Sequence, residues 1–487
     1  MIKVVFLLTI HKLINYHSHS KIMKSILRSA QYFFLFVALS YFVTSCNDDT
    51  TNDPLADKLV ANYDNSVAVA WNELFLDVER YASGYRPGPA PRALSILGLS
   101  AYEACVSGMP DFNSLQNEIP GLVIPKISRG LEYHWPTVVN ASYGYLMPKF
   151  FVDVRPDLFV KLDQLKTKYE NIYSGQVNTV VFERSKAHGE AVAAAIWEWS
   201  KTDTYGHEAY KDPFKGYDWK TAYKKAGDWR PLDEVNGKAM FPYWGKVRSY
   251  TLNSEDKLTC RKQSAPYSEV VGSAYYTQAA EVMTHNTPTQ PYESEWIGEF
   301  WSDDLLNLTF SPPSRWIAIA NQVYLNEKCS LETAVYANAK VGMSINDAGV
   351  GCWYSKYKYN LERPFTYIRK FIKPDWETNL YDPLTPGAKN ITPSFPAYPS
   401  GHATFGGAGA EALSSIFGYG YAMTDNCHKN RVEFEGKPRT FSSFYEMADE
   451  NGYSRIPLGV HWRMDSEEGV RFGKEIGRRV SNLPWKK

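Results

Sequence analysis

Three short segments in the last third of the sequence hold residue types suited to binding a small tetrahedral oxyanion. They are residues 356–364, 399–402 and 454–465. Their positive charges are Lys356, Arg363 and Arg455. Arginine offers a planar fork of N–H donors to oxygen atoms, whereas lysine acts as a point charge. No other part of the sequence gathers this chemistry, so we expect the three segments to converge on one oxyanion site.

The spacing within the first segment predicts how its two cations are placed. Lys356 and Arg363 are seven residues apart, which is two helical turns, so we expect both side chains on one helix face. Pro364 follows directly, and the residue before a proline avoids the helical region. A helix end or kink there would aim Arg363 inward.

The other two segments predict a helix N-terminus and a histidine–carboxylate pair. Ser400 and Gly401 precede an alanine-rich stretch, so they should lie where unpaired N–H groups and the positive end of the helix dipole favour an anion. His402 follows them. His461 and Asp465 are spaced i, i+4, which on a helix would bring the carboxylate near the imidazole.

Taken together, the segments resemble the signature of the type 2 phosphatidic acid phosphatase and vanadium haloperoxidase superfamily. The local sequence is most similar to the vanadium chloroperoxidase branch at residues 347–349, 353–356, 395–406 and 454–465. Four further segments resemble haloperoxidase-related bacterial proteins: residues 229–231, 242–245, 300–304 and 312–316. The resemblance covers residues 65–480 and is stronger after residue 295.

The resemblance implies which residues would hold vanadate. Its equatorial oxygens would be bound by Lys356, Arg363, Arg455, Ser400 and Gly401. A carboxylate that orients Arg363 is matched to Asp304, with Asp303 as a rival. Vanadate is therefore the cofactor that the resemblance implies.

The resemblance also implies the catalytic groups. His461 would be the apical vanadium ligand in a peroxidase, or the residue that accepts the phosphoryl group in a phosphatase, with Asp465 holding its tautomer. His402 would be the acid/base. Trp353 and Phe395 match residues near the halide site of chloroperoxidases.

Three functions are compatible with these residues. The first is a haloperoxidase that uses hydrogen peroxide to oxidise a halide to a hypohalous species, which halogenates a small organic acceptor. The second is an acid phosphatase that acts on phosphate monoesters through a phosphohistidine, because phosphate has the shape of vanadate. The third is an oxyanion-binding lipoprotein without turnover. The aromatic residues Trp353 and Phe395 favour the first.

The N-terminus predicts export as a bacterial lipoprotein. Residues 23–45 have a short basic start and an apolar run at 32–43, typical of a signal peptide. Cys46 would be lipidated and would anchor the protein to a membrane, at the periplasmic side or the cell surface. A membrane-spanning helix is the weaker reading, because the run is short of the ~20 residues needed. Residues 1–22 then reflect start-site choice, and residues 46–60 form a flexible acidic tether.

Composition narrows the function classes further. The chain has 487 residues with 53 basic and 53 acidic side chains, so no charge excess indicates a nucleic-acid partner. The phosphate-loop, H-E-x-x-H and Cys-x2-Cys patterns are absent. Five cysteines follow Cys46, and their spacing assigns no disulfide. The sequence leaves the oligomeric state open.

Helical spacing predicts an all-α protein of packed bundles, and the resemblance implies the two-bundle chloroperoxidase architecture. We expect helices at 65–83, 90–108, 137–150, 157–173, 178–201, 269–285, 293–308, 313–326, 330–362, 401–416, 440–450 and 464–481. Residues 61–285 would form a supporting region, with an irregular excursion at 204–265, and residues 286–487 a catalytic region. An excursion of this length usually has a covering or functional role.

Overall fold

The computed structural model describes residues 58–285, 289–385 and 391–487. The expected signal peptide, the lipidated Cys46 and most of the tether lie outside the described residues. The last three tether positions are described, and they do not form a loose linker: Val60 is buried, and Lys58 O accepts a hydrogen bond from Trp135 Nε1 at 2.6 Å.

The fold is all-α, as predicted, and its helices come from nearly every expected segment. The α-helices are α3 Ser66–Glu79, α4 Pro89–Cys105, α5 Trp135–Phe150, α6 Pro156–Ser174, α7 Thr179–Lys201, α8 Trp219–Ala222, α9 Glu255–Leu258, α10 Ala274–His285, α11 Tyr292–Phe300, α12 Arg315–Asn326, α13 Leu331–Tyr359, α14 Pro364–Phe371, α15 Gly401–Phe417, α16 Phe444–Tyr453 and α17 Arg463–Ser481. Short 3₁₀ helices are η2 Val60–Asn62, η3 Val106–Gly108, η4 Ala209–Lys211 and η5 Trp244–Lys246.

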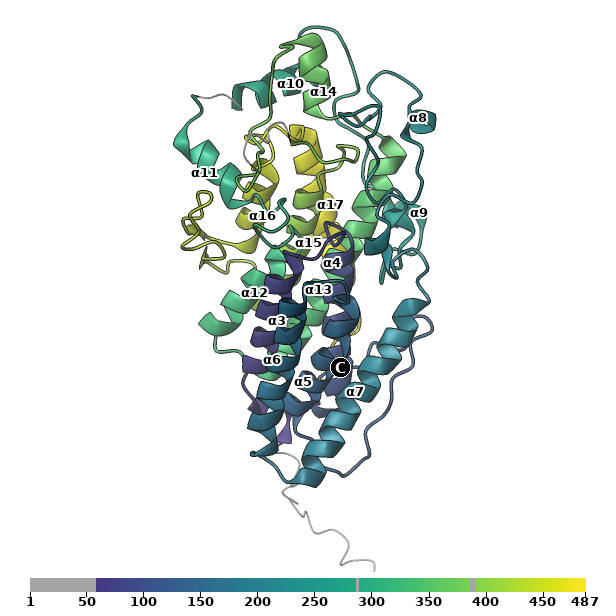
Figure 1. Cartoon of the computed structure of the whole chain (residues 1–487), viewed down its shortest axis with the longest axis vertical. Helices are drawn as coiled ribbons and strands as arrows, with labels where there is room; N and C mark the ends of the chain where they lie inside the picture. The colour runs from purple at the N-terminus through teal and green to yellow at the C-terminus, as the bar shows by residue number, and fades with distance from the viewer. Residues whose placement is uncertain (1–57, 286–288, 386–390) are drawn as a thin grey trace, which may run out of the picture. The chain divides into compact units, whose positions relative to one another are not determined.

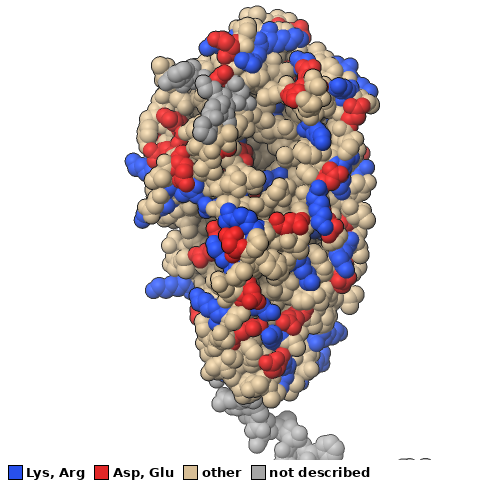
Figure 2. Space-filling model, in the orientation of Figure 1, with Lys and Arg blue, Asp and Glu red and all other residues tan. Residues whose placement is uncertain are grey.

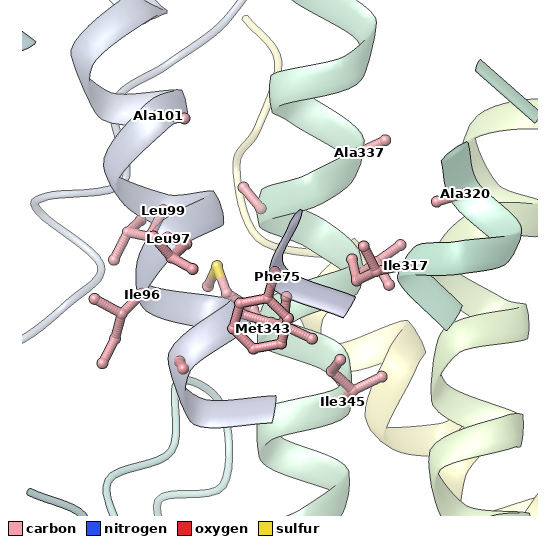
Figure 3. Packing of buried hydrophobic residues seen from close by; sticks show 14 of the residues in the cluster. Phe75, Ile96, Leu97, Leu99, Ala101, Ile317, Ala320, Ala337, Met343 and Ile345 are labelled. Carbon is pink, nitrogen blue, oxygen red and sulfur yellow. The ribbon is translucent and has the colours of Figure 1, made fainter. Parts of the chain in front are cut away.

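Helix α13 is the centre of the packing. It contacts α4 along much of its length and also packs on α15 and α17, while α5 packs between α4, α6 and α7 (Figure 1). Apolar side chains from α3, α4, α12 and α13 meet in one core, among them Phe75, Leu97, Ile317 and Met343 (Figure 3). Burial of these faces is the main favourable term in holding the helices together.

Helices α15 and α17 approach closely because glycines line their contact. A Cβ on Gly473 would lie 2.2 Å from Thr404 O, and a Cβ on Gly407 would lie 2.3 Å from Val470 O. Only glycine fits at such distances. This contact fixes the start of α15, which carries Ser400 and His402, relative to the start of α17.

Three helix predictions need correction. Helix α11 ends at Phe300 rather than 308, because buried Arg315 takes Phe300 O and Asp303 as partners at 3.1 and 3.2 Å. Residues 439–441 pair with residues 423–425 as a two-stranded antiparallel ladder (β2 Arg439–Phe441, β1 Met423–Asp425) before α16 begins. Helix α14 was not expected; Pro364 begins it, as proline at the first helical position often does.

Contacts join residues 57–487 into one compact unit. Helix α4 of the expected supporting region and α13 of the expected catalytic region share a core, so the division at residue 286 stays a prediction. The helices within residues 204–265 are short: η4, α8, η5 and α9. This segment covers the site side of α13: Met240 N donates to Ser394 O at 2.8 Å, and Trp229 N donates to Asn360 O at 2.7 Å.

The surface carries charges of both signs. Lysine, arginine and acidic side chains are intermixed on the face drawn in Figure 2, and a hollow opens in its upper half. Within the described residues, no helix has the length and apolar character to cross a membrane. The five cysteines of the described part form no disulfide.

Candidate active site

Seven of the predicted site residues line one cavity of about 280 Å³, namely Asp304, Trp353, Phe395, Gly401, His402, Arg455 and His461. Lys356, Arg363, Ser400 and Asp465 are not among its lining residues. Its polar end is formed by His402, His461, Arg455 and Asp304. Its walls are mostly apolar and include Trp353, Phe395, Phe405, Met240, Leu380 and Ile391. The cavity therefore joins a charged end to a mainly apolar chamber, the usual character of a small-molecule site.

Lys356 and Arg363 do not share one helix face, which corrects the expected placement. Helix α13 ends at Tyr359, and Asn360 adopts a left-handed conformation with φ 49°. Arg363 is the N-cap residue of α14. The break between the helices agrees with the predicted helix end before Pro364, and the Arg363 side chain there is buried.

The Lys356 ammonium is satisfied by backbone oxygens. Its Nζ donates to Pro396 O at 3.0 Å, to Ala397 O at 2.8 Å and to Pro399 O at 2.5 Å. Burial lowers the pKa of Lys356 to about 7, while the three carbonyl acceptors favour the protonated form. Lys356 thus places positive charge behind the 396–399 loop.

The two arginines carry donors that lack a partner. Arg363 donates from Nε to Phe395 O at 3.0 Å and from Nη1 to Val460 O at 2.8 Å, but its buried Nη2 has no acceptor among the described residues. Arg455 Nε and Nη1 are likewise buried without an acceptor there. Each guanidinium belongs to a residue only 1% exposed, so these donors are costly unless an anion meets them.

An oxyanion fits this donor set. Three buried cations, Lys356, Arg363 and Arg455, are accompanied by only two carboxylates, Asp304 and Asp465. Burial lowers the pKa of Arg363 to about 9. A bound anion would accept from the unpaired N–H groups and offset the excess positive charge. No group of three or more histidine, cysteine or acidic residues suited to a metal cation occurs in the described ranges.

His461 and Asp465 are paired, although not through two turns of one helix. Helix α17 begins at Arg463, so His461 precedes it and Asp465 lies in its first turn. Asp465 Oδ2 lies 2.8 Å from His461 Nδ1 and accepts from Trp462 N at 3.2 Å. His461 Nε2 lies 3.0 Å from Arg363 Nη1.

The environment keeps His461 neutral. Burial, followed by the charge of Arg363, holds the pKa of His461 well below its ordinary value. Burial raises the pKa of Asp465 to about 7. With Nδ1 facing the carboxyl group, Nε2 is the nitrogen that can offer a lone pair to a ligand.

The Ser400–Gly401 pair lies at a helix N-terminus, as predicted. Ser400 is the N-cap of α15, and its Oγ accepts from Ala403 N at 3.4 Å. Ser400 N donates to Asp465 O at 2.9 Å, which ties the starts of α15 and α17 together. Gly401 and His402 both line the cavity.

Asp304 orients Arg455 rather than Arg363, which corrects the predicted partner. Its Oδ2 accepts from Arg455 Nη2 at 2.8 Å and lies 3.7 Å from His402 Nε2. The rival Asp303 is engaged elsewhere, 3.2 Å from Arg315 Nη1 and 2.8 Å from His428 Nε2. Sequence adjacency could not reveal that the two carboxylates face different partners.

His402 stands at the polar end as a neutral base. Burial, and then the charge of Arg455, lowers its pKa to about 4. Its Nε2 is buried and makes no hydrogen bond within the described part of the chain. This nitrogen is therefore free to accept a proton from a substrate in the cavity.

Trp353 and Phe395 meet on the cavity wall, with ring centroids 5.0 Å apart. Their place at a halide site stays a prediction. Sequence reasoning missed a charged lining residue, Arg86, which precedes α4 in the N-terminal half. No local pattern marks it, because its partners lie far away in sequence.

Comparisons with known proteins agree with this geometry. Residues 337–484 match the family described as VCPO second helical-bundle domain. Vanadium chloroperoxidase from Curvularia inaequalis is 26% identical over 280 residues, covering 46% of each chain. Vanadium-dependent bromoperoxidase from Ascophyllum nodosum is 32% identical over 98 residues, covering 18% of each. The chain thus spans less than half the length of these curated relatives.

Solved structures match over a larger share of the chain. The structure described as the first bacterial vanadium dependant iodoperoxidase has a TM-score of 0.74 and 26% identity, covering 87% of this chain and 97% of that one. A holo-type bacterial vanadium-dependent chloroperoxidase has a TM-score of 0.59 at 14% identity, covering 86% and 97%. The similarity to the chloroperoxidase structure shows a shared fold, whereas the similarity to the iodoperoxidase structure also includes the amino-acid sequence.

Proposed function

We propose that the chain is a vanadate-dependent haloperoxidase, because residues 337–484 match the VCPO second helical-bundle domain and the chain is similar to vanadium haloperoxidases. It would use hydrogen peroxide to oxidise a halide, and the hypohalous product would halogenate a small organic acceptor. One observation carries the proposal. Arg455, with two buried N–H donors that lack an acceptor among the described residues, lines one cavity together with the neutral imidazoles of His402 and His461, and Arg363, which also has an unpaired donor, contacts His461 Nε2 at 3.0 Å.

The chain's own residues suit vanadate. The unpaired donors of Arg363 and Arg455 and the N-terminus of α15 would bind its oxygens, with Lys356 adding charge from behind the loop. His461 Nε2 would be the ligand nitrogen. When bound, vanadate supplies a Lewis-acid centre that polarises peroxide.

Asp465 prepares His461 for this role. Its carboxyl group holds Nδ1 at 2.8 Å and so selects the tautomer with the lone pair on Nε2. In this structure, Arg363 Nη1 lies 3.0 Å from His461 Nε2. Ligand binding would transfer that donor from the imidazole to an oxygen of the anion.

His402 would move the proton of the peroxide. Its low pKa makes it neutral at neutral pH, and its unpaired Nε2 faces the cavity. Asp304, 3.7 Å away, would stabilise the imidazolium that forms. General base help of this kind contributes about 10²–10⁴-fold. The apolar wall of Trp353 and Phe395 would limit water around the halide.

Export and anchoring are a separate proposal. We infer that residues 23–45 are a lipoprotein signal peptide and that Cys46 is lipidated, because a basic start and an apolar run precede this cysteine. The protein would then be anchored to a membrane, at the periplasmic side or the cell surface. Cys46→Ser should release it from the membrane fraction; membrane retention of the variant would exclude the anchor.

One assay tests the enzymatic proposal. Purified protein is incubated with and without vanadate, hydrogen peroxide and each halide, and halogenation of a phenolic dye is followed. We expect turnover that requires all three additions and is lost in His461→Ala. Hydrolysis of phosphate monoesters that vanadate inhibits, without halogenation, would instead identify a phosphatase. Anion binding without either reaction would identify a binding protein.

A further inference from the structure

Arg86 brings a fourth cation to the cavity that holds the proposed vanadate site. It lines the same cavity as Asp304, Arg455 and His402, yet it comes from the N-terminal half of the chain. Its side chain is only 11% exposed. A guanidinium so far removed from water must find acceptors or pay for the loss of hydration.

The guanidinium is held in place from one side. Its Nη2 donates to Thr309 O, and its Nε lies 3.8 Å from Glu79 Oε1. Glu79 is itself fixed, because its Oε2 accepts from Ser311 N at 2.8 Å. These contacts orient Arg86 without using all its donors.

The remaining donors are unpaired. Arg86 Nε and Nη1 are buried and have no acceptor in the part of the chain that the structure describes. The nearby carboxylates do not supply one: Asp304 is engaged by Arg455 at 2.8 Å, and the Glu79 distance of 3.8 Å is too long for a hydrogen bond. Burial also raises the pKa of Glu79, which favours its neutral form and leaves the charge of Arg86 less compensated.

We propose that Arg86 forms a second anion subsite on the cavity wall, separate from the vanadate cage, for a small monovalent anion. Such an anion is either the halide on its way to oxidation or the carboxylate of the organic acceptor. Both accept N–H hydrogen bonds, and the apolar walls beside Arg86 suit a halide or an aromatic body equally. This inference deepens the proposed function and rests on it, and Arg86 then helps to set substrate preference.

A binding experiment without turnover separates this inference from the enzymatic one. Bromide and benzoate are titrated calorimetrically into vanadate-free protein, comparing the parent chain with Arg86→Gln. We expect the dissociation constant of at least one anion to rise about ten-fold, the size of one lost charge-assisted hydrogen bond. Arg155→Gln, an exposed arginine paired with Asp157, is the control and should leave both constants unchanged.

Each outcome decides the matter. Weaker bromide binding alone identifies a halide subsite, and weaker benzoate binding alone identifies an acceptor subsite. Unchanged constants for both anions overturn the inference even if the protein is an active haloperoxidase. Two further variants control for the loss of the cation beside Glu79. The double variant Glu79→Gln/Arg86→Gln removes both charges and should bind the anions as weakly as Arg86→Gln does. Arg86→Lys keeps the charge but has fewer N–H donors, so it should bind the anions with intermediate strength.

Kinetics extend the test to the working enzyme. The vanadate-loaded parent and Arg86→Gln are compared with bromide and two phenols that differ only in a carboxylate. A halide subsite predicts a higher KM for bromide with both phenols. An acceptor subsite predicts a higher KM for the carboxylated phenol alone. A fall in kcat with every KM unchanged would contradict both and assign Arg86 a structural role.

Discussion

Asp304 Oδ2 accepts a hydrogen bond from Arg455 Nη2 at 2.8 Å, so a carboxylate fixes the guanidinium whose other nitrogens face the cavity. The same oxygen lies 3.7 Å from His402 Nε2. Burial opposes ionisation of Asp304, but the charge of Arg455 holds its pKa below its ordinary value. One acidic side chain therefore positions both a donor and the base of the proposed site.

Asp304→Asn should weaken vanadate binding by about ten-fold or more, the usual cost of losing a residue that orients a ligand. Its neighbour provides a matched control. Asp303 contacts Arg315 and His428 instead, so Asp303→Asn should lower the melting temperature and leave the vanadate dissociation constant within two-fold of the parent value. Equal effects of the two variants on vanadate affinity would show that the Asp304–Arg455 pair has no special role.

The His461–Asp465 contact predicts a graded response. His461→Ala should abolish tight vanadate binding, because the ligand nitrogen is lost. Asp465→Asn should keep binding but weaken it by about 10–100-fold, because an amide holds the tautomer of His461 less firmly than a carboxyl group does. Equilibrium dialysis of vanadate against both variants measures this. If His461→Ala binds vanadate as the parent does, the ligand assignment is wrong.

The buried His402 predicts an acid-sensitive fold. Its pKa is about 4 in the folded protein and 6.5 as an ordinary value, so the unfolded chain binds a proton that the folded chain resists. The contribution of His402 to the free energy of unfolding is therefore fully present above pH 6.5 and is lost as the pH falls from 6.5 towards 4. The loss attributable to His402 is about 3 kcal/mol.

Urea unfolding at pH 7 and at pH 4.5 measures this loss. His402→Gln cannot titrate, so its free energy of unfolding should fall less between the two pH values than that of the parent. His285→Gln is the control. His285 Nδ1 lies 3.4 Å from Tyr453 Oη, and His285 does not line the cavity. The free energy of unfolding of this variant should fall between the two pH values as much as that of the parent. A parallel decline in all three proteins would refute the assignment.

Most of the fold could be predicted from the sequence, because helical periodicity is a local signal. The order of the motifs predicted which residues form the cage, and their roles there stay a prediction. The local geometry within the cage could not be predicted. Lys356 and Arg363 have helical spacing, yet the left-handed Asn360 separates them into two elements. The Asp465 carboxylate reaches His461 from the first turn of a helix that His461 does not join.

Contacts between residues far apart in the sequence could not be predicted either. Asp304 faces Arg455, and Arg86 faces Thr309, across separations that no spacing rule describes. A three-residue β-ladder is too short for a period-2 pattern to reveal. Residues whose roles depend on such pairing become visible only when distant segments are placed together.

The α15–α17 contact links packing to chemistry and gives a final prediction. Gly473→Ala would place a methyl group 2.2 Å from Thr404 O, which is backbone and cannot rotate away, so the helices must separate. We expect a loss of about 1–3 kcal/mol in the free energy of unfolding, typical of overpacking. Ser400 caps α15, His402 lies in its first turn, and His461 lies just before α17. Vanadate affinity should therefore fall as well.

Gly420→Ala is the matched control for this change. A Cβ on Gly420 would meet nothing within 4 Å, so the same substitution should alter stability by less than about 0.5 kcal/mol. Both variants are measured by urea unfolding and by vanadate titration. If Gly473→Ala loses stability but keeps full vanadate affinity, the helix contact supports the fold without setting the geometry of the cage. Loss of both would show that the interhelical distance positions the site.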